Sequence, residues 1–452
     1  MKYQVYARHN FNKIPSYGRL SQDQIQNINV VSEVLPFKTN NYVVNELIDW
    51  DNYLDDPMYI LNFPQKSMLK LSQFQTLSQM LRNNTPKTEL AKYVHEIRLN
   101  LNPHPAGQLE HNVPTLNNGD QLTGIQHKYR ETMLFFPTQG QTCHAYCTFC
   151  FRWPQFTGLN EMKFAMKQPN LMVAYLKENP FITDILFTGG DPMVMKTSIF
   201  EKYINAILEA DLPQLKTIRI GTKSLSFWPY RFTTDPDAQD MLDLFERVTD
   251  QGIHLAFMSH FNHHRELETD ALKEAVARIQ KTGAQIRTQS PLLRNINDDP
   301  NVWATMWRKQ VDLGMIPYYM FVARDTGAQS YFGVTLEKAH HIFNEAYQRV
   351  SGICRTVRGP SMSAGPGKVR IVGITELQGE KVFVLEFLQG RDPGWVGKPF
   401  FAAFNQEAYW LDDLVPAFGE SEFFFEKEYK KLLKVDKLPA GHMLKTVNQQ
   451  YA

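Results

Sequence analysis

The chain has only four cysteines among its 452 residues, too few for the disulfide framework of a small secreted fold. It also has no surplus of one charge, because 48 lysines and arginines face 47 aspartates and glutamates. That balance argues against a broad binding surface for nucleic acid or for an anionic membrane. The N-terminus lacks an apolar leader, and no apolar run reaches the roughly 18 residues of a membrane span. We therefore expect a cytoplasmic protein in a reducing compartment, without nucleic-acid or membrane partners.

Three of the four cysteines lie together as Cys143, Cys147 and Cys150, with the spacing C-x3-C-x2-C. Cysteine thiolates are the usual ligands of iron–sulfur clusters. Three thiolates hold a [4Fe-4S] cube by three corners and leave one iron open to the amino and carboxylate groups of S-adenosylmethionine (SAM). With Phe149 before the last cysteine, the spacing resembles the radical-SAM signature, which implies a 5′-deoxyadenosyl radical. A four-ligand zinc site and unrelated structural thiols are the alternatives.

From about residue 130 onward, short apolar strands alternate with helical patterns. The expected strands are 134–136, 184–187, 217–220, 254–258, 285–287 and 317–322, and the expected helices are 162–177, 197–209, 237–251, 267–282, 301–313 and 335–349. A strand–helix repeat of roughly 30 residues is typical of parallel βαβ units. Six units predict an α/β fold, a partial (β/α)6 barrel of TIM type, whose chemistry lies at the carboxyl ends of the strands.

Two further regions flank this predicted barrel, which spans residues 121–350. Residues 1–120 predict a mostly helical accessory region that serves as a cap or as the interface of a homo-oligomer. Residues 351–452 predict an α+β extension. The patterns behind these assignments are helical spacing at 73–81 and 89–99, a breaker cluster at 103–107, a glycine–proline loop at 359–368, strands at 369–375 and 381–388 around a turn, and an amphipathic helix at 422–435.

Polar and glycine residues gather where the predicted strands end. Gly189 and Gly190 follow the second strand, where glycine permits close backbone approach to a ligand. Together with the aromatic residue in the cysteine loop, the strand ends give the expected SAM contacts: Phe149, Thr188, Gly189, Gly190, Asp191, Thr222, His260 and Gln289. A plain tight turn, loop packing and hydrogen-bonded core packing are the alternatives for these residues.

Lys368 follows the glycine–proline sequence Gly365-Pro366-Gly367. It is a candidate Schiff-base lysine for pyridoxal 5′-phosphate (PLP), because imine formation requires an amine that can lose its proton. A solvated loop lysine is the alternative. The fourth cysteine, Cys354, stands alone and is expected to be a small buried residue.

Taken in order, these motifs resemble the lysine 2,3-aminomutase family of radical-SAM, PLP-dependent enzymes. The motifs that carry the resemblance are Gly124–Tyr129, the cysteine loop, Thr188–Asp191, Arg219–Thr222, His260–His263, Gln289–Arg294, Pro317–Tyr319 and Gly365–Lys368. The resemblance implies a partial β/α barrel, an amino-acid substrate and an electron donor such as flavodoxin or ferredoxin. It also implies that Lys368 carries PLP, that Lys128 holds the PLP phosphate, and that Arg152 pairs with the substrate α-carboxylate.

The chain departs from the lysine-specific members at two positions. Those members use two aspartates to hold the distal ammonium of the substrate, and the aligned residues here are Arg324 and Ser361. A lysine ammonium that faces a buried arginine is unfavourable, so we expect a substrate other than lysine, with a neutral or acidic side chain. Asp325 is adjacent to Arg324, so an alignment shifted by one residue places one carboxylate at this position. The other hypotheses are a radical-SAM enzyme that has lost PLP and abstracts hydrogen from another small molecule or peptide, and a non-catalytic iron–sulfur scaffold.

Overall fold

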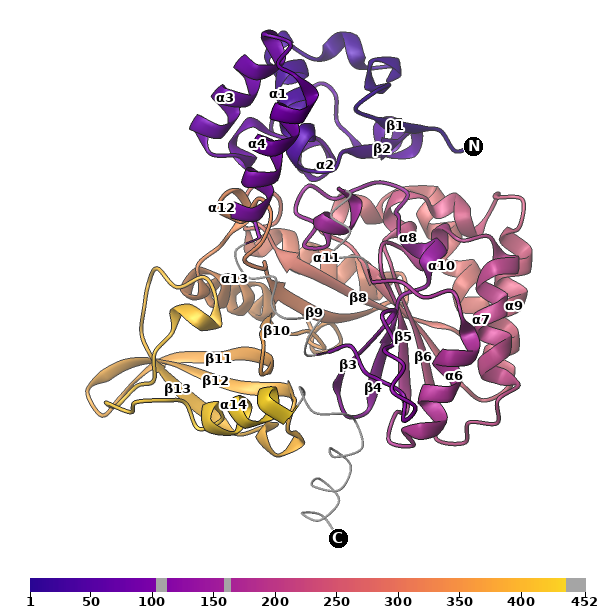
Figure 1. Cartoon of the computed structure of the whole chain (residues 1–452), viewed down its shortest axis with the longest axis vertical. Coiled ribbons are helices and arrows are strands. Elements are labelled where there is room, and N and C mark those ends of the chain that lie inside the picture. Colours follow the sequence, from indigo (N-terminus) through magenta and orange to yellow (C-terminus); the bar gives the residue numbers. More distant parts are fainter. Residues whose placement is uncertain (103–111, 158–163, 436–452) are drawn as a thin grey trace.

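The computed structural model describes residues 1–102, 112–157 and 164–435. The predicted breaker cluster at 103–107 lies outside these ranges. Within them, the largest unit is an eleven-stranded sheet, in which the strands follow one another from β3 to β13 in sequence order. Figure 1 shows the N-terminal region above this sheet and the last strands extending to one side.

The central strands of the sheet, β4 to β10, are all parallel. They are β4 (Thr132–Phe135), β5 (Asp184–Phe187), β6 (Thr217–Thr222), β7 (His254–His260), β8 (Gln285–Leu292), β9 (Ile316–Val322) and β10 (Arg358–Ser363). The strand β3 (Ile125–Tyr129) pairs antiparallel with β4 at one edge. The fold is therefore α/β with a large, mostly parallel sheet, and the first six parallel strands confirm the predicted ones.

A helix lies in the connection between each pair of successive parallel strands. These helices are α6 (Pro169–Glu178), α7 (Thr197–Leu208), α9 (Ala238–Asp250), α10 (Asp270–Lys281), α11 (Pro300–Asp312) and α13 (Leu336–Gln348). In α10 the Thr269 side chain accepts a hydrogen bond from Leu272 N and caps the helix. Leu272, Ala275, Val276 and Ile279 are buried at the 3–4 residue spacing of a core-facing stripe. The predicted helices are confirmed, although α6 begins at Pro169 rather than near residue 162.

The predicted glycine–proline loop at 359–368 is wrong. Strand β10 occupies its first half, and Lys368 lies in the next strand, β11 (Gly367–Leu377). Pro360 falls where the pairing of β10 with β9 shifts register, so its missing N–H interrupts no regular ladder. A Cβ at Gly359 would lie 2.5 Å from the Met320 carbonyl oxygen, so glycine is needed for close strand approach. The two residue types mark an irregular central strand rather than a loop.

The N-terminal region is mostly helical, as predicted. Its elements are β1 (Val5–Ala7), α1 (Gln22–Val34), β2 (Lys38–Asn40), the π-helix η3 (Val43–Leu47), α2 (Pro57–Asn62), α3 (Leu71–Arg82) and α4 (Lys87–Asn100). Its hydrophobic core does not stop at the boundary of the region. Ala145 and Trp153 of the cysteine loop and Trp228 and Leu293 of the sheet unit belong to the same cluster. The region is thus packed onto the cysteine loop.

The C-terminal region extends the sheet with antiparallel strands. After β11 come β12 (Glu380–Gly390), β13 (Pro399–Ala403) and the helix α14 (Glu426–Val435), which begins four residues later than predicted. The turn between β11 and β12 places Gln378 and Gly379 at φ values of 52° and 79°, which matches the left-handed turns that two-residue hairpins favour. Short helices α8 (Ser224–Phe227) and α12 (Gln329–Phe332) complete the described α-helices.

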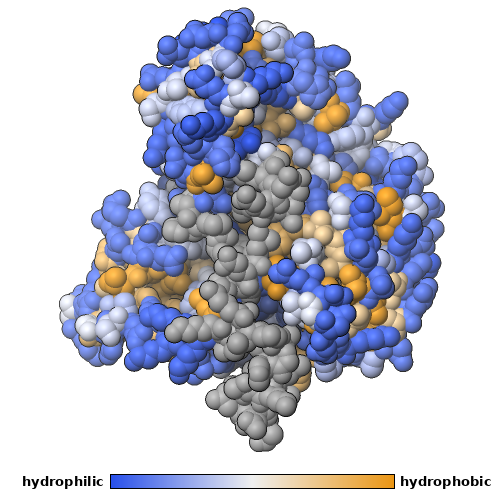
Figure 2. All heavy atoms as spheres, in the orientation of Figure 1, coloured by the Kyte–Doolittle hydropathy of each residue, from blue (hydrophilic) through white to orange (hydrophobic). Residues whose placement is uncertain are grey.

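The face drawn in Figure 2 is mainly hydrophilic, with apolar residues gathered in patches over the C-terminal strands and beside the sheet. One groove of about 470 Å³ lies on the C-terminal region between Phe400, Phe418 and Phe424. Among the helices of the described chain, none is long and apolar enough to cross a membrane.

Candidate active site

The cysteine loop follows β4, at the carboxyl end of the parallel strands, where the sequence predicted it. Cys143, Cys147 and Cys150 are half-buried, and none forms a disulfide. Thr222 and His260 end the parallel strands β6 and β7, whereas Gln289 lies within β8, three residues before its end. The sheet register places His260 of β7 opposite Gln289 of β8. Catalytic groups of parallel β/α folds are usually carried by this edge.

Burial raises the pKa of the three thiols. The pKa of Cys150 rises to about 11, and that of Cys143 rises well above its usual range because of burial and then because of Asp191. Buried thiols of this kind remain protonated unless a metal or a cation stabilises the thiolate. Three unbridged thiols on one short loop fit the donor set of an iron–sulfur cluster. In the described chain, no group of three His, Cys, Asp or Glu side chains is arranged to hold a single metal ion.

The N-terminal region fixes the backbone of this loop, a role that the sequence did not reveal. Tyr146 N donates to the Lys38 carbonyl at 2.8 Å, and Thr148 N donates to the Leu61 carbonyl at 2.9 Å. The Tyr3 hydroxyl donates to the His144 carbonyl at 2.7 Å. These contacts join residues about a hundred positions apart, so local sequence patterns carry no signal for them.

Gly189 and Gly190 lie against the residues that precede Cys143. A Cβ at Gly190 would lie 2.4 Å from Thr142 O and 2.5 Å from Thr142 N. Gly189 has a φ of +140°, and a Cβ there would lie 2.2 Å from Gln141 Nε2. The glycines therefore allow the β5 loop and the cysteine loop to pack together. Their contact with SAM, and that of Thr188, stays a prediction.

Asp191 is almost fully buried, at 2% exposure, and both its carboxylate oxygens accept hydrogen bonds. The donors are Thr222 Oγ1 at 2.7 Å, Met193 N and Lys223 N at 2.9 Å, and Ser224 Oγ at 3.0 Å. Asp191 thus joins the end of β5 to the end of β6. This arrangement fixes the ends of the two strands that follow β4 in the sheet.

The rings of Phe149 and His260 face each other at a centroid distance of 5.7 Å and an interplanar angle of 31°. Burial, and then the charge of Lys223, holds the pKa of His260 well below its usual range. A neutral His260 ring beside Phe149 offers a flat, uncharged surface beside the loop, as an adenine ring requires. Lys223, which the sequence did not single out, donates to Glu266 Oε1 at 2.5 Å and to the His260 carbonyl at 3.2 Å.

A second group of site residues is a cluster of positively charged side chains carried by strands of the sheet. The Lys368 ammonium lies 4.0 Å from the Tyr319 ring centroid, and Arg358 lies 4.6 Å from the same centroid. Burial lowers the pKa of Lys368 to about 7, and the charges of Arg219 and Arg358 lower it in the same direction. Lys368 is thus an amine that loses its proton near neutral pH, as a Schiff-base lysine requires. Tyr319, Arg219 and Arg358 supply this environment, and the sequence had not identified their role.

Lys128 of β3 reaches the same cluster. Its Nζ donates a hydrogen bond to the Ala364 carbonyl, at the turn before Lys368. Burial, and then the charges of Arg391, Arg324 and Lys368, hold the pKa of Lys128 well below its usual range. The structure therefore brings together the two residues predicted to contact PLP.

Arg152 and Arg324 both lie near the ring of Phe151, with guanidinium carbons 5.1 Å and 5.5 Å from its centroid. Burial lowers the pKa of Arg152 to about 10 and also lowers that of Arg324, whereas Asp325 opposes the shift at Arg324. Within the described chain, neither guanidinium has a hydrogen bond or an ion pair. Phe151 is 42% exposed, whereas both arginine side chains are half-buried.

Ser361 is fully buried in β10, and its hydroxyl donates to the Met320 carbonyl at 3.3 Å. Its hydrogen bond is thus directed to the neighbouring strand. Ser361 therefore offers no charge at the place where the sequence resemblance implies an aspartate in lysine-specific enzymes.

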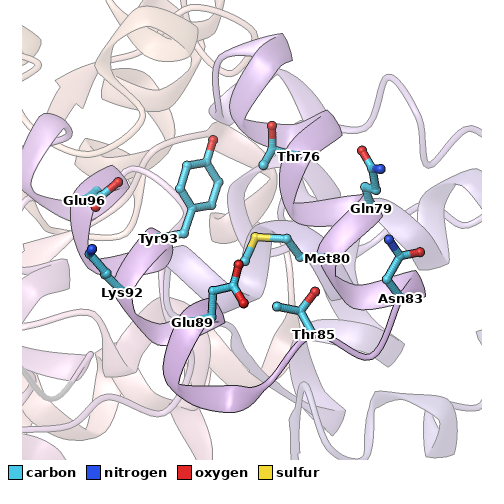
Figure 3. A pocket seen from close by; sticks show the side chains of 9 residues that line it. All are labelled: Thr76, Gln79, Met80, Asn83, Thr85, Glu89, Lys92, Tyr93 and Glu96. Atoms are coloured by element: carbon cyan, nitrogen blue, oxygen red, sulfur yellow. The ribbon is translucent and has the colours of Figure 1, made fainter.

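A pocket of about 410 Å³ between α3 and α4 lies elsewhere, on the N-terminal region (Figure 3). Its charged lining residues are Glu89, Lys92 and Glu96. None of the predicted site residues lines this pocket.

Comparison with known proteins gives the class and then the family. A protein of Aquifex aeolicus named "Putative L-lysine 2,3-aminomutase" is 30% identical over 401 residues, which cover 89% of this chain and 93% of that protein. The L-lysine 2,3-aminomutase of Escherichia coli is 27% identical over 51% of this chain and 63% of its own, and that of Clostridium subterminale is 27% identical over 56% and 57%. No family model matches the chain.

The solved structures that match align with only part of this chain. SuiB of Streptococcus suis is 10% identical with a TM-score of 0.35, over 64% of this chain and 60% of that one. Coproporphyrinogen III oxidase of Escherichia coli, described as a radical SAM enzyme, is 12% identical with a TM-score of 0.32, over 49% and 52%.

The long alignment with the Aquifex protein defines the chain as a radical SAM isomerase. More specifically, it belongs to the lysine 2,3-aminomutase family, as a divergent member. Membership implies SAM and a [4Fe-4S] cluster as cofactors.

Proposed function

We propose that this chain is a PLP-dependent 2,3-aminomutase whose substrate is an amino acid other than lysine, with a neutral or acidic side chain. The observation that carries the proposal is Arg324, a half-buried guanidinium without a hydrogen-bond or ion-pair partner in the described chain. A substrate carboxylate would satisfy its donors in a bidentate arrangement. A lysine ammonium at the same place would face a buried like charge.

The surroundings of Arg324 support the same interpretation. The charges of Arg324 and Lys368 lower the pKa of Lys128, and Arg324 also lowers that of Arg152. The one carboxylate that opposes the shift at Arg324 is that of Asp325. Such a concentration of positive charge favours a ligand set with several anionic groups, such as a phosphate and two carboxylates.

Cys143, Cys147 and Cys150 are the proposed cluster ligands. The cluster and SAM, when bound, supply a 5′-deoxyadenosyl radical that takes a hydrogen atom from the substrate. The Phe149 and His260 rings bind the adenine, and Gln289 and Thr222 lie beside the ribose. The Thr188–Asp191 loop accepts hydrogen bonds from the amino group of SAM. The order of these residues along the carboxyl edge of the sheet, from β4 to β8, supports this assignment.

PLP, when bound, delocalises the unpaired electron while the amino group migrates from C2 to C3. Lys368 provides the amine that binds the cofactor, and Lys128 contacts its phosphate. Arg152 orients the substrate through the α-carboxylate, and Arg324 and Ser361 lie beside the substrate side chain. Holding the reacting carbon in one orientation supplies a large part of the acceleration in such reactions.

We further propose that the strands β4 to β9 and their helices form a partial (β/α)6 barrel around these groups. The N-terminal region, whose core includes Ala145 and Trp153 of the cysteine loop, closes the barrel over the cluster and shields the radical from water. The electron that reduces the cluster comes from a donor such as flavodoxin or ferredoxin.

The test is an anaerobic screen of the full chain with reconstituted cluster, SAM, PLP and reductant. Lysine, glutamate and glutamine are supplied separately, and the β-amino acid product is measured by mass spectrometry after chromatographic separation. We expect isomerised glutamate or glutamine at a rate well above that of lysine. Lysine as the fastest substrate would contradict the proposal.

A radical SAM enzyme without PLP is the second candidate, and the position of Lys368 favours it. Lys368 lies inside strand β11, paired with Gln389 and Ser363, rather than in a glycine-rich loop. The two candidates differ in their spectra. PLP bound to Lys368 gives a visible absorption band that disappears in Lys368→Ala, whereas an enzyme without PLP gives no such band in the wild-type chain.

A further inference from the structure

Lys38, in strand β2 of the N-terminal region, holds the cysteine loop at two points. Its Nζ donates to the Cys143 carbonyl at 2.6 Å and lies 3.2 Å from Thr142 Oγ1. Its own carbonyl accepts a hydrogen bond from Tyr146 N at 2.8 Å. The same residue thus fixes the segment Cys143–Tyr146 from both ends, at the first of the three predicted cluster ligands.

Neighbouring residues of β2 reinforce this contact. Ala7 of β1 pairs with Lys38, which keeps the strand in register. Asn40, which is fully buried, donates from Nδ2 to the His144 carbonyl at 3.2 Å and to the Phe227 carbonyl at 2.9 Å. The lysine is therefore held by a rigid strand and does not depend on a flexible loop for its position.

No carboxylate neutralises the charge of Lys38 in the part of the chain that the structure describes. Within the described residues its polar contacts are a carbonyl and a hydroxyl, and the Tyr146 ring lies 5.5 Å from Nζ. Lys223, another lysine close to the loop, differs from Lys38 because it forms an ion pair with the buried Glu266. Lys38 therefore places an ammonium group without a carboxylate partner among the described residues beside Cys143.

We propose that Lys38 is a positioning residue for the iron–sulfur cluster. Lys38 fixes Cys143 by a hydrogen bond to the Cys143 carbonyl, and the charge of Lys38 makes reduction of the cluster easier. The reduction potential of such clusters depends on nearby charge and on hydrogen bonds around the ligands. Reduction adds a negative charge, so a fixed cation nearby stabilises the reduced state. The proposal rests on Cys143, Cys147 and Cys150 as ligands, and it gives the N-terminal region a role beyond covering the site.

The experiment compares the wild-type chain with Lys38→Met, Lys38→Arg and a control, Lys92→Met. Lys92 is an exposed lysine of α4 in the same region. Each full-length protein is reconstituted anaerobically, its iron and sulfide content is measured, and the cluster is titrated potentiometrically with electron paramagnetic resonance (EPR) as the readout. Circular dichroism checks that each variant is folded.

We expect the midpoint potential of Lys38→Met to shift to a more negative value, while Lys38→Arg and Lys92→Met stay near the wild type. A folded Lys38→Met that fails to load iron, with loading restored in Lys38→Arg, also supports the proposal. An unchanged potential in a fully loaded Lys38→Met would overturn it, as would loss of loading in both variants. A wild-type chain that assembles no cluster would instead contradict the assignment of the three cysteine ligands.

Discussion

Lys128 Nζ donates a hydrogen bond to the carbonyl oxygen of Ala364 and so joins strand β3 to the turn that precedes Lys368. The contact brings a second amine into the surroundings of Lys368. The charge of Lys368 is one of those that lower the pKa of Lys128. An edge strand and a C-terminal strand thus place two amines in the region where we propose that an anionic cofactor binds.

The first prediction follows from this contact. Lys128→Met removes the cation expected at the PLP phosphate, and such a charged hydrogen bond contributes about 1.5–3 kcal/mol, or roughly a 10- to 150-fold change in affinity. We expect weaker PLP binding by that factor in a titration followed by visible absorption. Lys128→Arg, which keeps the charge, should bind nearly as well as the wild type. Equal affinity in the methionine variant would exclude Lys128 from the phosphate site.

The second prediction concerns pH. The pKa of Lys368 is about 7, lowered by burial and then by Arg219 and Arg358, so the neutral amine predominates above that pH. Formation of the visible PLP band should therefore increase as pH rises through about 7. Removing a neighbouring cation raises the pKa of the amine, so Arg358→Met should move the transition to higher pH.

The matched control for Arg358→Met is Arg355→Met. Arg355 also lies over a tyrosine ring, that of Tyr347 at 5.6 Å, but it is exposed and is not one of the charges that shift the pKa of Lys368. Its pH transition should match that of the wild type. Equal transitions in both variants would argue that Arg358 does not influence the amine.

The third prediction tests the packing of the two loops. Gly190→Ala places a Cβ about 2.4 Å from the Thr142 backbone, which cannot move as a side chain can, so the cysteine loop must shift. We expect Gly190→Ala to lose most of its iron after reconstitution. Gly373→Ala is the control, because nothing lies within 4 Å of a Cβ there. Normal iron content in Gly190→Ala would contradict the close contact between the loops.

Much of this architecture could be predicted from the sequence, because it depends on local periodicity. The strand at 254–258 contains a run of consecutive apolar residues, and the helix at 267–282 repeats its apolar residues every three or four positions; both are present as β7 and α10. The cysteine spacing likewise lies within eight residues. In each case the signal is contained in a short segment.

The rest depends on contacts that no short segment contains. Lys38 and Leu61 hold the cysteine loop through backbone carbonyls, which any residue type supplies. Strand β10 was predicted as a loop because Gly359 and Pro360 usually interrupt structure, whereas here they fit a register shift beside β9. The environment of Lys368 depends on Arg219, which comes from a strand far away in the sequence.

The fourth prediction changes substrate preference. Arg324→Asp replaces the guanidinium beside Phe151 with a carboxylate, which favours a distal ammonium over a distal carboxylate. A change of one charged hydrogen bond corresponds to about 1.5–3 kcal/mol, so the ratio of kcat/KM for glutamate to that for lysine should fall at least about 10-fold. Arg355→Asp, an exposed site, should leave the ratio unchanged. An unaltered ratio in Arg324→Asp would place the substrate side chain elsewhere.

The proposed function depends above all on three cysteine thiolates that hold a [4Fe-4S] cluster and leave one of its irons open. The most direct measurement is EPR spectroscopy of the anaerobically reconstituted, reduced full-length protein, before and after addition of SAM. The account predicts a [4Fe-4S] signal that changes when SAM is added and that is absent in Cys147→Ala. A protein without a cluster signal, or one whose signal is the same with and without SAM, would contradict it.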